Sequence, residues 1–327
     1  MQPAPSDKPR LELIDIARGL ALVAMAIYHF GWDLEFFGYM GAGTTAHGGW
    51  RLFARCIASS FLFLVGVGLF LGHGRGIRWP SFRRRLVMIA AAAAAISVVT
   101  WFAVPGGFIF FGILHQIALA SVLGLLFLRV PAWLIIIIAV FVITAPNYLR
   151  SPFFDHPVWW WVGLSSTNPH ANDYVPLFPW FGAVLLGIAA ARIAAGAGLF
   201  DRIAALRTGK WGRPLIFFGR HSLAFYLIHQ PVLIACVWLI AQVWPAPAQS
   251  PQANFMQACN RQCSEAQDSA FCTRYCVCAL ETVEEQGLLG EIFVANPSEE
   301  TRTRMNDISL YCTNIVSFPP APETGNE

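Results

Sequence analysis

The sequence contains few charged residues for its length. Only 13% of its 327 residues are Asp, Glu, Lys or Arg, and the mean hydropathy is +0.53. A soluble domain carries roughly a quarter charged residues, so this shortage excludes a soluble globular protein of the same size. The shortage is concentrated in residues 11–245, where long apolar stretches follow one another.

Several motifs of soluble enzymes are missing as well. The sequence has no H-E-x-x-H metal site, no Walker phosphate loop and no G-x-S-x-G nucleophile elbow. No internal repeat is apparent, which argues against the inverted-repeat transporter folds. The basic residues form short clusters between apolar stretches, as is typical of cytoplasmic loops. We therefore expect neither a bound metal nor a nucleic-acid partner.

Seven apolar segments approach the length of about 20 residues that a membrane helix needs. They run near Leu11–Phe30, Leu52–Gly72, Leu86–Val104, Phe108–Leu128, Ala132–Tyr148, Val175–Ile193 and Leu215–Trp244. The first segment contains Asp15 and Arg18 and lacks a cleavage site, so we expect a helix rather than a removable signal peptide. The pattern predicts an all-α, polytopic transmembrane bundle of about seven helices in the lipid bilayer. A homo-oligomer is one possible assembly of this bundle.

The distribution of charge predicts the orientation of the bundle. With the N-terminus in the cytoplasm, 13 Lys and Arg residues lie on the cytoplasmic side, and only Arg51, Arg55 and Arg150 lie opposite. The segment after residue 245 is instead acidic, with 4 basic against 11 acidic residues. We therefore expect a cytoplasmic tail at 1–10, a transmembrane domain at 11–245 and a periplasmic tail at 246–327, in a bacterial inner (plasma) membrane.

Six of the eight cysteines lie in the acidic tail, at Cys259, Cys263, Cys272, Cys276, Cys278 and Cys312. The first four form two pairs spaced four residues apart, so each pair occupies one face of a helix. Two facing helices could be joined by two disulfides, which leaves Cys278 to meet Cys312, although spacing alone does not fix the connectivity. A zinc site is the alternative, but the spacings lack the usual C-x2-C form. Disulfides require an oxidising compartment. We expect Cys56 and Cys236 to pack inside the bundle.

The first apolar segment carries ionisable residues that are costly within a membrane. Asp15 and Arg18 are three residues apart and can pair on one helix face near the cytoplasmic end. One interpretation is a structural ion pair that anchors the helix. The other is that Arg18 binds an anionic cytoplasmic ligand, because guanidinium suits phosphate.

Several histidines and hydroxyl groups could carry chemistry. His29 is expected at the outer end of the first helix, and His47 lies in a glycine-flanked outer loop where it suits a general base or an acyl acceptor. His115 lies inside the fourth segment. Ser222, Tyr226 and His229 are spaced to form one stripe on the last segment. That stripe either makes hydrogen bonds between helices or lines a channel.

Three stretches resemble one known family. They are Ile14–Leu22 with Tyr28-His29-Phe30, the His47-x-x-Trp50 motif, and the Ser222-Leu223-Ala224-x-Tyr226-Leu227-x-His229 run. Together they resemble the heparan-alpha-glucosaminide N-acetyltransferase catalytic-domain family, in its short bacterial branch. The resemblance covers roughly residues 10–243, and the cysteine-rich tail lies outside it.

The resemblance implies an enzyme that takes acetyl from cytoplasmic acetyl-CoA and transfers it to an amino sugar or hydroxyl of a periplasmic glycan. By motif the catalytic histidine is His47, and the other candidate catalytic residues are His29, Ser222, Tyr226 and His115. The candidates for binding acetyl-CoA are Asp15, Arg18, Arg83, Arg84, Arg85, Arg213 and Arg220. The candidates for binding the acceptor are Trp50, Asp173, Trp180 and His229.

Two other classes of function compete with acyl transfer. A transporter or flippase would use the same charges, but a proton-coupled transporter needs paired carboxylates at mid-membrane depth, and none is visible in the sequence. An envelope interaction protein would bind a partner through its tail. An acyltransferase differs from both because it requires acetyl-CoA and a reactive histidine.

The orientation gives the first testable prediction. A reporter that is active only in the cytoplasm is expected to be silent when fused after Glu327, and a periplasmic reporter is expected to work. The reason is the charge bias of 13 to 3, together with an odd number of crossings. Paired fusions in one host measure both activities. An active cytoplasmic reporter would mean that one crossing, the fifth or the seventh, is miscounted.

Overall fold

The structure is a computed structural model and describes residues 11–41, 43–167, 169, 171–205, 209, 212–247, 250–263, 267–293 and 297–317. The expected tail 1–10, with Lys8 and Arg10, lies outside the described residues, as do Arg207 and Lys210. All regular structure in the described part is helical, which confirms the predicted all-α class.

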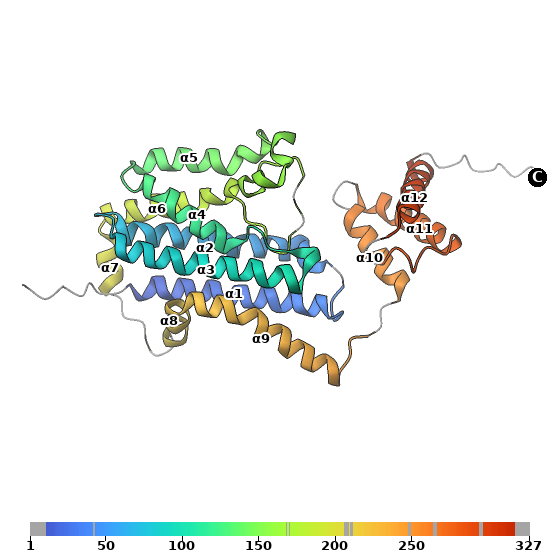
Figure 1. Cartoon of the computed structure of the whole chain (residues 1–327), viewed down its shortest axis with the longest axis horizontal. Coiled ribbons are helices and arrows are strands. Elements are labelled where there is room, and N and C mark those ends of the chain that lie inside the picture. The colour runs from blue at the N-terminus through green and yellow to red at the C-terminus, as the bar shows by residue number, and fades with distance from the viewer. Residues whose placement is uncertain are drawn as a thin grey trace, which may run out of the picture. The chain divides into compact units, whose positions relative to one another are not determined.

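The helices follow one another along the chain (Figure 1). The apolar part comprises α1 (Glu12–Phe36), α2 (Gly48–His73), α3 (Trp79–Ala103), α4 (Ile113–Phe127), α5 (Ala132–Thr144), α6 (Leu177–Gly196), α7 (Leu199–Ala205), α8 (Arg213–Arg220) and α9 (Ser222–Val243). The acidic tail comprises α10 (Pro251–Cys263), α11 (Ser269–Glu285) and α12 (Glu299–Ser317). Short 3-10 helices lie at Thr44–Ala46, Pro105–Gly107, Ala145–Asn147, Pro152–Asp155 and Pro157–Val162.

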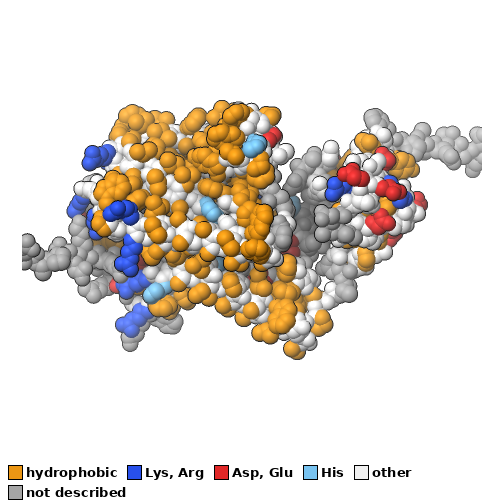
Figure 2. All heavy atoms as spheres, viewed as in Figure 1, with side chains coloured by type: hydrophobic (Ala, Val, Ile, Leu, Met, Phe, Trp, Pro, Cys, Tyr) orange, Lys and Arg blue, Asp and Glu red, His pale blue; other side chains and the backbone are white. Residues whose placement is uncertain are grey.

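The helices confirm a multi-pass membrane protein. By length and composition α1, α2, α3, α6 and α9 can each span a bilayer, whereas α4 and α5 are apolar but shorter. The exposed surface of these helices is largely hydrophobic (Figure 2). Phe102 on α3 and Ile137 on α5 are among the large hydrophobic side chains that are exposed. Such a surface is unfavourable in water and is covered by acyl chains in a membrane.

Three of the predicted boundaries are wrong. Helix α1 continues to Phe36, so His29 lies within it rather than at its end. Helix α3 begins at Trp79 instead of Leu86, because a proline at its second position favours helix initiation, and Arg83, Arg84 and Arg85 are therefore helical. The seventh segment is divided between α8 and α9 at His221, whose backbone leaves the helical conformation.

Contacts divide the chain into two units. Unit 1 comprises Met1–Ile27 and Phe53–Val232, and unit 2 comprises Tyr28–Leu52 and Leu233–Glu327. The boundaries fall inside α1, α2 and α9. This division differs from the boundary at 245 expected from the sequence, which stays a prediction.

The core of unit 1 depends on close backbone contact between α2 and α6. A Cβ atom at Gly66 would collide with the backbone carbonyl of Val184, and one at Gly187 would collide with that of Phe63. Leu62, on α2, and Leu185, on α6, are fully buried beside these contacts. Helix α6 also packs against α4 and α5, and α4 packs against α3. Small residues let membrane helices approach closely, which strengthens their van der Waals contact.

The tail helices in unit 2 have a small core and three disulfides. Cys259 bonds to Cys276, Cys263 to Cys272, and Cys278 to Cys312. This confirms the expected disulfides and the facing helices. The core between them includes Phe255, Val283 and Ile308.

The other two cysteines do not pack inside the bundle as expected. Cys56 and Cys236 are both exposed on their helices. Cys236 lies in a uniformly apolar stretch, where the sequence does not distinguish a buried helix face from a lipid-facing one, and Cys56 directly follows the charged residue Arg55.

The α2–α6 contact yields a stability prediction. Gly187→Leu is expected to destabilise the folded protein by about 1–3 kcal/mol, because the new side chain must displace the α2 backbone. Thermal unfolding in detergent measures the effect. Gly196→Leu is the matched control, since it lies at the end of the same helix with no atom within 4 Å of an added Cβ. Equal melting temperatures for the two variants would contradict this account of the interface.

Candidate active site

His47 lies in the turn that joins the 3-10 helix Thr44–Ala46 to α2, within unit 2. Its Nδ1 atom is 3.0 Å from the carbonyl oxygen of Gly43. Because a carbonyl only accepts hydrogen bonds, Nδ1 must carry the proton, and the neutral ring then has its lone pair on Nε2. Gly43 and Gly48 adopt positive φ angles of 69° and 54°, which glycine tolerates. The turn therefore fixes one tautomer of His47.

A carboxylate from α1 holds this loop. Glu35 Oε2 accepts hydrogen bonds from the backbone N–H of Thr45 at 2.8 Å and from its hydroxyl at 2.7 Å. Glu35 Oε1 accepts another from the N–H of Gly43. Thr45 is buried, with 2% exposure. Glu35 thus positions the residue whose carbonyl oxygen holds the His47 ring.

Trp50 and His29 lie close to the same segment. The Tyr28 ring is 6.2 Å from the Trp50 ring and 5.6 Å from the His29 ring. A Cβ at Gly31 would collide with the Trp50 indole, so Trp50 packs directly on α1. The Tyr28 hydroxyl also donates to the Thr45 carbonyl at 3.4 Å. Tyr28 thus lies beside His29 and Trp50 and contacts the segment that carries His47, and Trp50 has a packing role.

Unit 1 contains a cluster of arginines around one buried aspartate. Asp15 is 7% exposed and lies 3.4 Å from Arg18 and 3.5 Å from Arg220 of α8. The guanidinium groups of Arg18 and Arg85 both approach the backbone of Gly68 on α2. Helices α1, α3 and α8 therefore bring three positive charges and one negative charge together beside α2. This net positive charge can bind an anion.

Three basic candidates lie outside the cluster around Asp15. Arg83, Arg84 and Arg213 are exposed. Figure 2 shows Lys and Arg side chains gathered at the end of unit 1 that carries α7 and the connection from α2 to α3. Charges in these positions attract anions at long range more than they hold a bound group.

His115 is engaged at both ring nitrogens. Its Nδ1 accepts from the backbone N–H of Gly112 at 3.2 Å, so Nε2 carries the proton and donates to the Ser97 hydroxyl at 3.2 Å. Ser97 in turn donates to the Ile109 carbonyl at 2.7 Å. This chain of hydrogen bonds ties α3 to the start of α4. The geometry favours a structural role for His115 over oxyanion stabilisation.

Asp173 caps the start of α4. Its Oδ2 accepts from the N–H of Ile113 at 2.9 Å, where the helix dipole favours a negative charge. Burial raises the pKa of the Asp173 carboxyl to about 6, against the opposing effect of that hydrogen bond. Tyr226 of α9 lies near enough to interact electrostatically with Asp173.

Of the predicted stripe of Ser222, Tyr226 and His229 on α9, only some residues are buried in the bundle. Tyr226 packs against the core of unit 1, and His229 is 8% exposed. His229 Nδ1 lies 2.7 Å from the carbonyl of Tyr226, so it donates within its own helix, and the lone pair lies on Nε2. Ser222 begins the helix and is half-buried.

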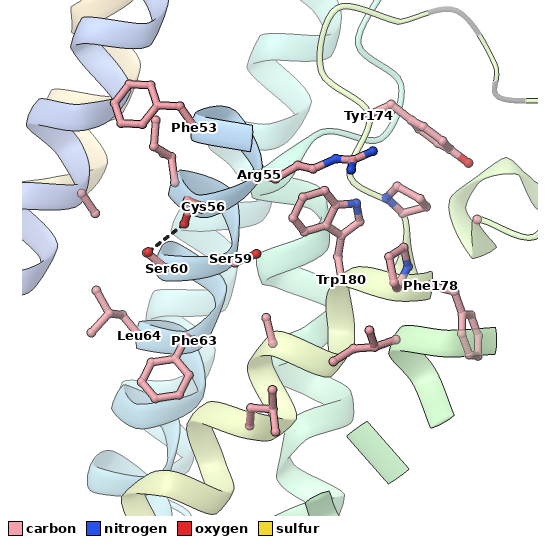
Figure 3. Close-up of a pocket in the computed structure, with 18 of the residues that line it drawn as sticks. Phe53, Arg55, Cys56, Ser59, Ser60, Phe63, Leu64, Tyr174, Phe178 and Trp180 are labelled. Atoms are coloured by element: carbon pink, nitrogen blue, oxygen red, sulfur yellow. Dashed lines mark hydrogen bonds between the residues drawn. The ribbon is translucent and has the colours of Figure 1, made fainter. Parts of the chain in front are cut away.

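A cavity of about 1300 Å³ opens in unit 1 between α1, α2, α6 and the segment after α5. Figure 3 shows its lining, with Arg55 extending from α2 toward Trp180 of α6. Trp180 is the one residue of the predicted site that lines it; Asp173, Tyr226 and His115 do not. This cavity is therefore separate from Asp173, Tyr226 and His115.

Sequence reasoning missed Glu35 and Gln116. Gln116 is completely buried in α4, and neither polar atom of its side chain has a hydrogen-bond partner among the described residues. An unsatisfied buried amide is expensive, which was a signal available from its position in an apolar segment. Glu35 gave no comparable signal, because its partners lie in an irregular loop.

The described residues contain no group of three or more His, Cys, Asp or Glu side chains suited to a metal ion. Searches of curated proteins and of solved structures found no match. A family model described as heparan-alpha-glucosaminide N-acetyltransferase, catalytic, matches residues 10–231. The chain belongs to this family.

Members of the heparan-alpha-glucosaminide N-acetyltransferase family are membrane acetyltransferases, so this chain is of that type. The family uses acetyl-CoA as its co-substrate. The match confirms the resemblance identified in the sequence. It includes the loop with His47 and the start of α9, and it excludes α10, α11 and α12.

The Asp173 cap predicts a dependence of stability on pH. The carboxyl titrates near 3.8 in the unfolded chain and near 6 in the folded one. Between these values the folded chain keeps a proton that the unfolded chain has lost, so this group lowers stability as pH rises through the window. Asp173→Asn keeps an oxygen for Ile113 and lacks this effect.

Its melting temperature relative to the wild type is therefore expected to increase from pH 4 to pH 6 and then to level off. Thermal unfolding in detergent across this range is the measurement. Asp201→Asn, an exposed change on α7, controls for the loss of one charge. If the curves of wild type and Asp173→Asn run parallel, the Asp173 carboxyl does not have the raised pKa.

Proposed function

We propose that the protein transfers an acetyl group from cytoplasmic acetyl-CoA to an amino sugar or hydroxyl of a periplasmic glycan. The observation that carries this proposal is the family match across residues 10–231. The proposed setting is a bacterial inner membrane with the N-terminus in the cytoplasm and the tail in the periplasm. The three disulfides of the tail support that setting, since they form in an oxidising compartment.

The donor binds, in this proposal, at the arginine cluster of unit 1. The phosphates of CoA are anionic, and planar guanidinium groups bind phosphate with paired hydrogen bonds. Arg18 and Arg220 are already fixed by Asp15, at 3.4 and 3.5 Å. That arrangement supports binding because little side-chain entropy is then lost when the ligand arrives.

His47 supplies the reactive nitrogen. In a direct route the acceptor nitrogen attacks the thioester carbonyl, Nε2 of His47 takes the proton, and CoA leaves as a thiolate that recovers a proton from the imidazolium. In a two-step route Nε2 attacks the carbonyl, the C–S bond breaks and CoA leaves as a thiolate. The acceptor then attacks the acetyl-imidazolium, the bond from Nε2 to the acetyl carbon breaks, and the acceptor proton passes to the thiolate. Both routes need the lone pair on Nε2, which the hydrogen bond from Nδ1 to Gly43 favours.

The other predicted residues take supporting roles. The hydroxyl groups of Ser222 and Tyr226 can donate to the oxyanion that forms on the thioester oxygen. Trp180 offers an aromatic surface for a sugar ring at the cavity. Trp50, Asp173 and His229 remain proposed acceptor contacts.

Replacing His47 tests the catalytic assignment. His47→Ala is expected to reduce acetyl transfer by about 10²–10⁴ if the residue is a general base, and further if it carries the acetyl group. Binding of acetyl-CoA should be largely retained, because the proposed donor site lies on other side chains. Transfer from labelled acetyl-CoA to amino-sugar acceptors is the rate measurement, and equilibrium binding of acetyl-CoA is the companion.

His29→Ala is the paired control. His29 lies within α1 and contacts the Tyr28 ring, so its loss should lower stability or rate only partly. Normal turnover in His47→Ala with lost turnover in His29→Ala would transfer the catalytic role to His29. If neither change affects transfer, the reaction does not depend on this loop and the catalytic assignment is wrong. Absence of any acetyl transfer by the wild-type protein is the result that would favour a transporter.

A further inference from the structure

The cavity of unit 1 is larger than a single sugar requires. Its volume of about 1300 Å³ exceeds the roughly 300–1,000 Å³ of common small-molecule sites. A monosaccharide fills only a fraction of such a space. The volume therefore indicates a ligand that carries another large chemical group in addition to a sugar.

One end of the cavity is cationic and aromatic. Arg55 and Arg150 both line it, together with Tyr174 and Trp180. Arg55 is exposed, and no described carboxylate forms an ion pair with it. Arg150 is close enough to Tyr174 to act on its hydroxyl electrostatically. Two guanidinium groups beside aromatic rings suit a phosphate joined to a sugar.

The rest of the wall is apolar and long. Ala21 and Ala24 of α1, Phe63 and Leu64 of α2, and Leu186 of α6 form part of it. On α2 the lining extends from Phe53 to Leu64, which is about 16 Å at 1.5 Å per residue. That length is about half of the 30 Å hydrocarbon thickness of a bilayer. An aliphatic chain fits this wall, and a free sugar does not need it.

The position of the arginines argues against acetyl-CoA as the occupant. In the proposed orientation Arg55 and Arg150 belong to the periplasmic side, whereas the anionic end of CoA arrives from the cytoplasm. A phosphate at Arg55 and Arg150 must therefore come from another molecule. Lipid phosphate groups lie at this level of the membrane, where arginines can reach them.

We infer that the acceptor is a lipid-linked amino sugar, held by its connecting phosphate at Arg55 and Arg150 with its aliphatic chain along α1, α2 and α6. The inference rests on the proposed function and names the class of its acceptor. The sugar then lies beside Trp180 and Tyr174. An ordinary phospholipid has the same phosphate but no sugar for these rings.

Binding of lipid tests the inference without requiring catalysis. The purified full-length chain in detergent is titrated with a long-chain polyprenyl phosphate and analysed by native mass spectrometry. Arg55→Gln and Arg150→Gln are each expected to weaken binding roughly tenfold, through loss of a charge-assisted hydrogen bond. Arg75→Gln is the control, since it follows the opposite end of α2 and does not line the cavity.

A second pair of variants tests the apolar wall. Ala24→Phe is expected to reduce binding of the polyprenyl phosphate at least tenfold by filling the cavity. Ala26→Phe lies on the same helix but outside the lining and should leave binding unchanged. Thermal unfolding identifies any variant that fails to fold. If a variant of one pair fails, binding by the variants of the other pair tests the inference.

Competition distinguishes the possible sources of the phosphate. Inorganic phosphate and phosphatidylglycerol vesicles are expected to displace the polyprenyl phosphate poorly. Equal displacement by phosphatidylglycerol would show an ordinary lipid site and overturn the inference, as would binding that is insensitive to all four variants. Transfer to a soluble amino sugar without polyprenyl phosphate binding refutes the inference alone. Binding without any acetyl transfer refutes the proposed function alone.

Discussion

The rest of this structure depends on the absence of water around most of its helices. Every backbone N–H and C=O within a bilayer must be satisfied internally, which requires helices. Since lipid tails are as apolar as leucine, burial alone does not hold such helices together. Close backbone contact does so here, at Gly66 and Gly187 between α2 and α6, and at Gly19 and Gly219 between α1 and α8.

The same constraint explains the placement of charge. A lone aspartate within a membrane helix is costly, but Asp15 lies between Arg18 and Arg220, which are supplied by two different helices. The contact of Gly219 with the backbone of Asp15 brings α8 near enough for this arrangement. Packing by small residues and the position of Arg220 thus depend on one another, because Gly219 directly precedes Arg220. A larger side chain at Gly219 would move that guanidinium group.

The sequence predicted features that depend on local spacing, and it missed those that depend on loops. Cysteines four residues apart define helix faces, so the two facing pairs of the tail could be anticipated. Apolar length likewise predicted the membrane helices. The start of α3 was misplaced because Arg83, Arg84 and Arg85 read as a loop, although arginine side chains can extend from a helix to the membrane surface. The hydrogen bonds of Glu35 and the place of Arg55 in the cavity lining could not be predicted, because each depends on a three-dimensional arrangement that spacing along the sequence does not define.

The loop that carries His47 is supported from outside the family region. Within unit 2 the Tyr39 hydroxyl donates to the carbonyl of Trp244, beyond the matched residues 10–231. Gln257 of α10 occupies the space that a side chain at Gly41 would need. Helix α10 is itself fixed to α11 by the disulfides of Cys259 and Cys263. The cysteine-rich tail therefore places a disulfide-linked helix next to Gly41, in the glycine-rich loop that carries His47.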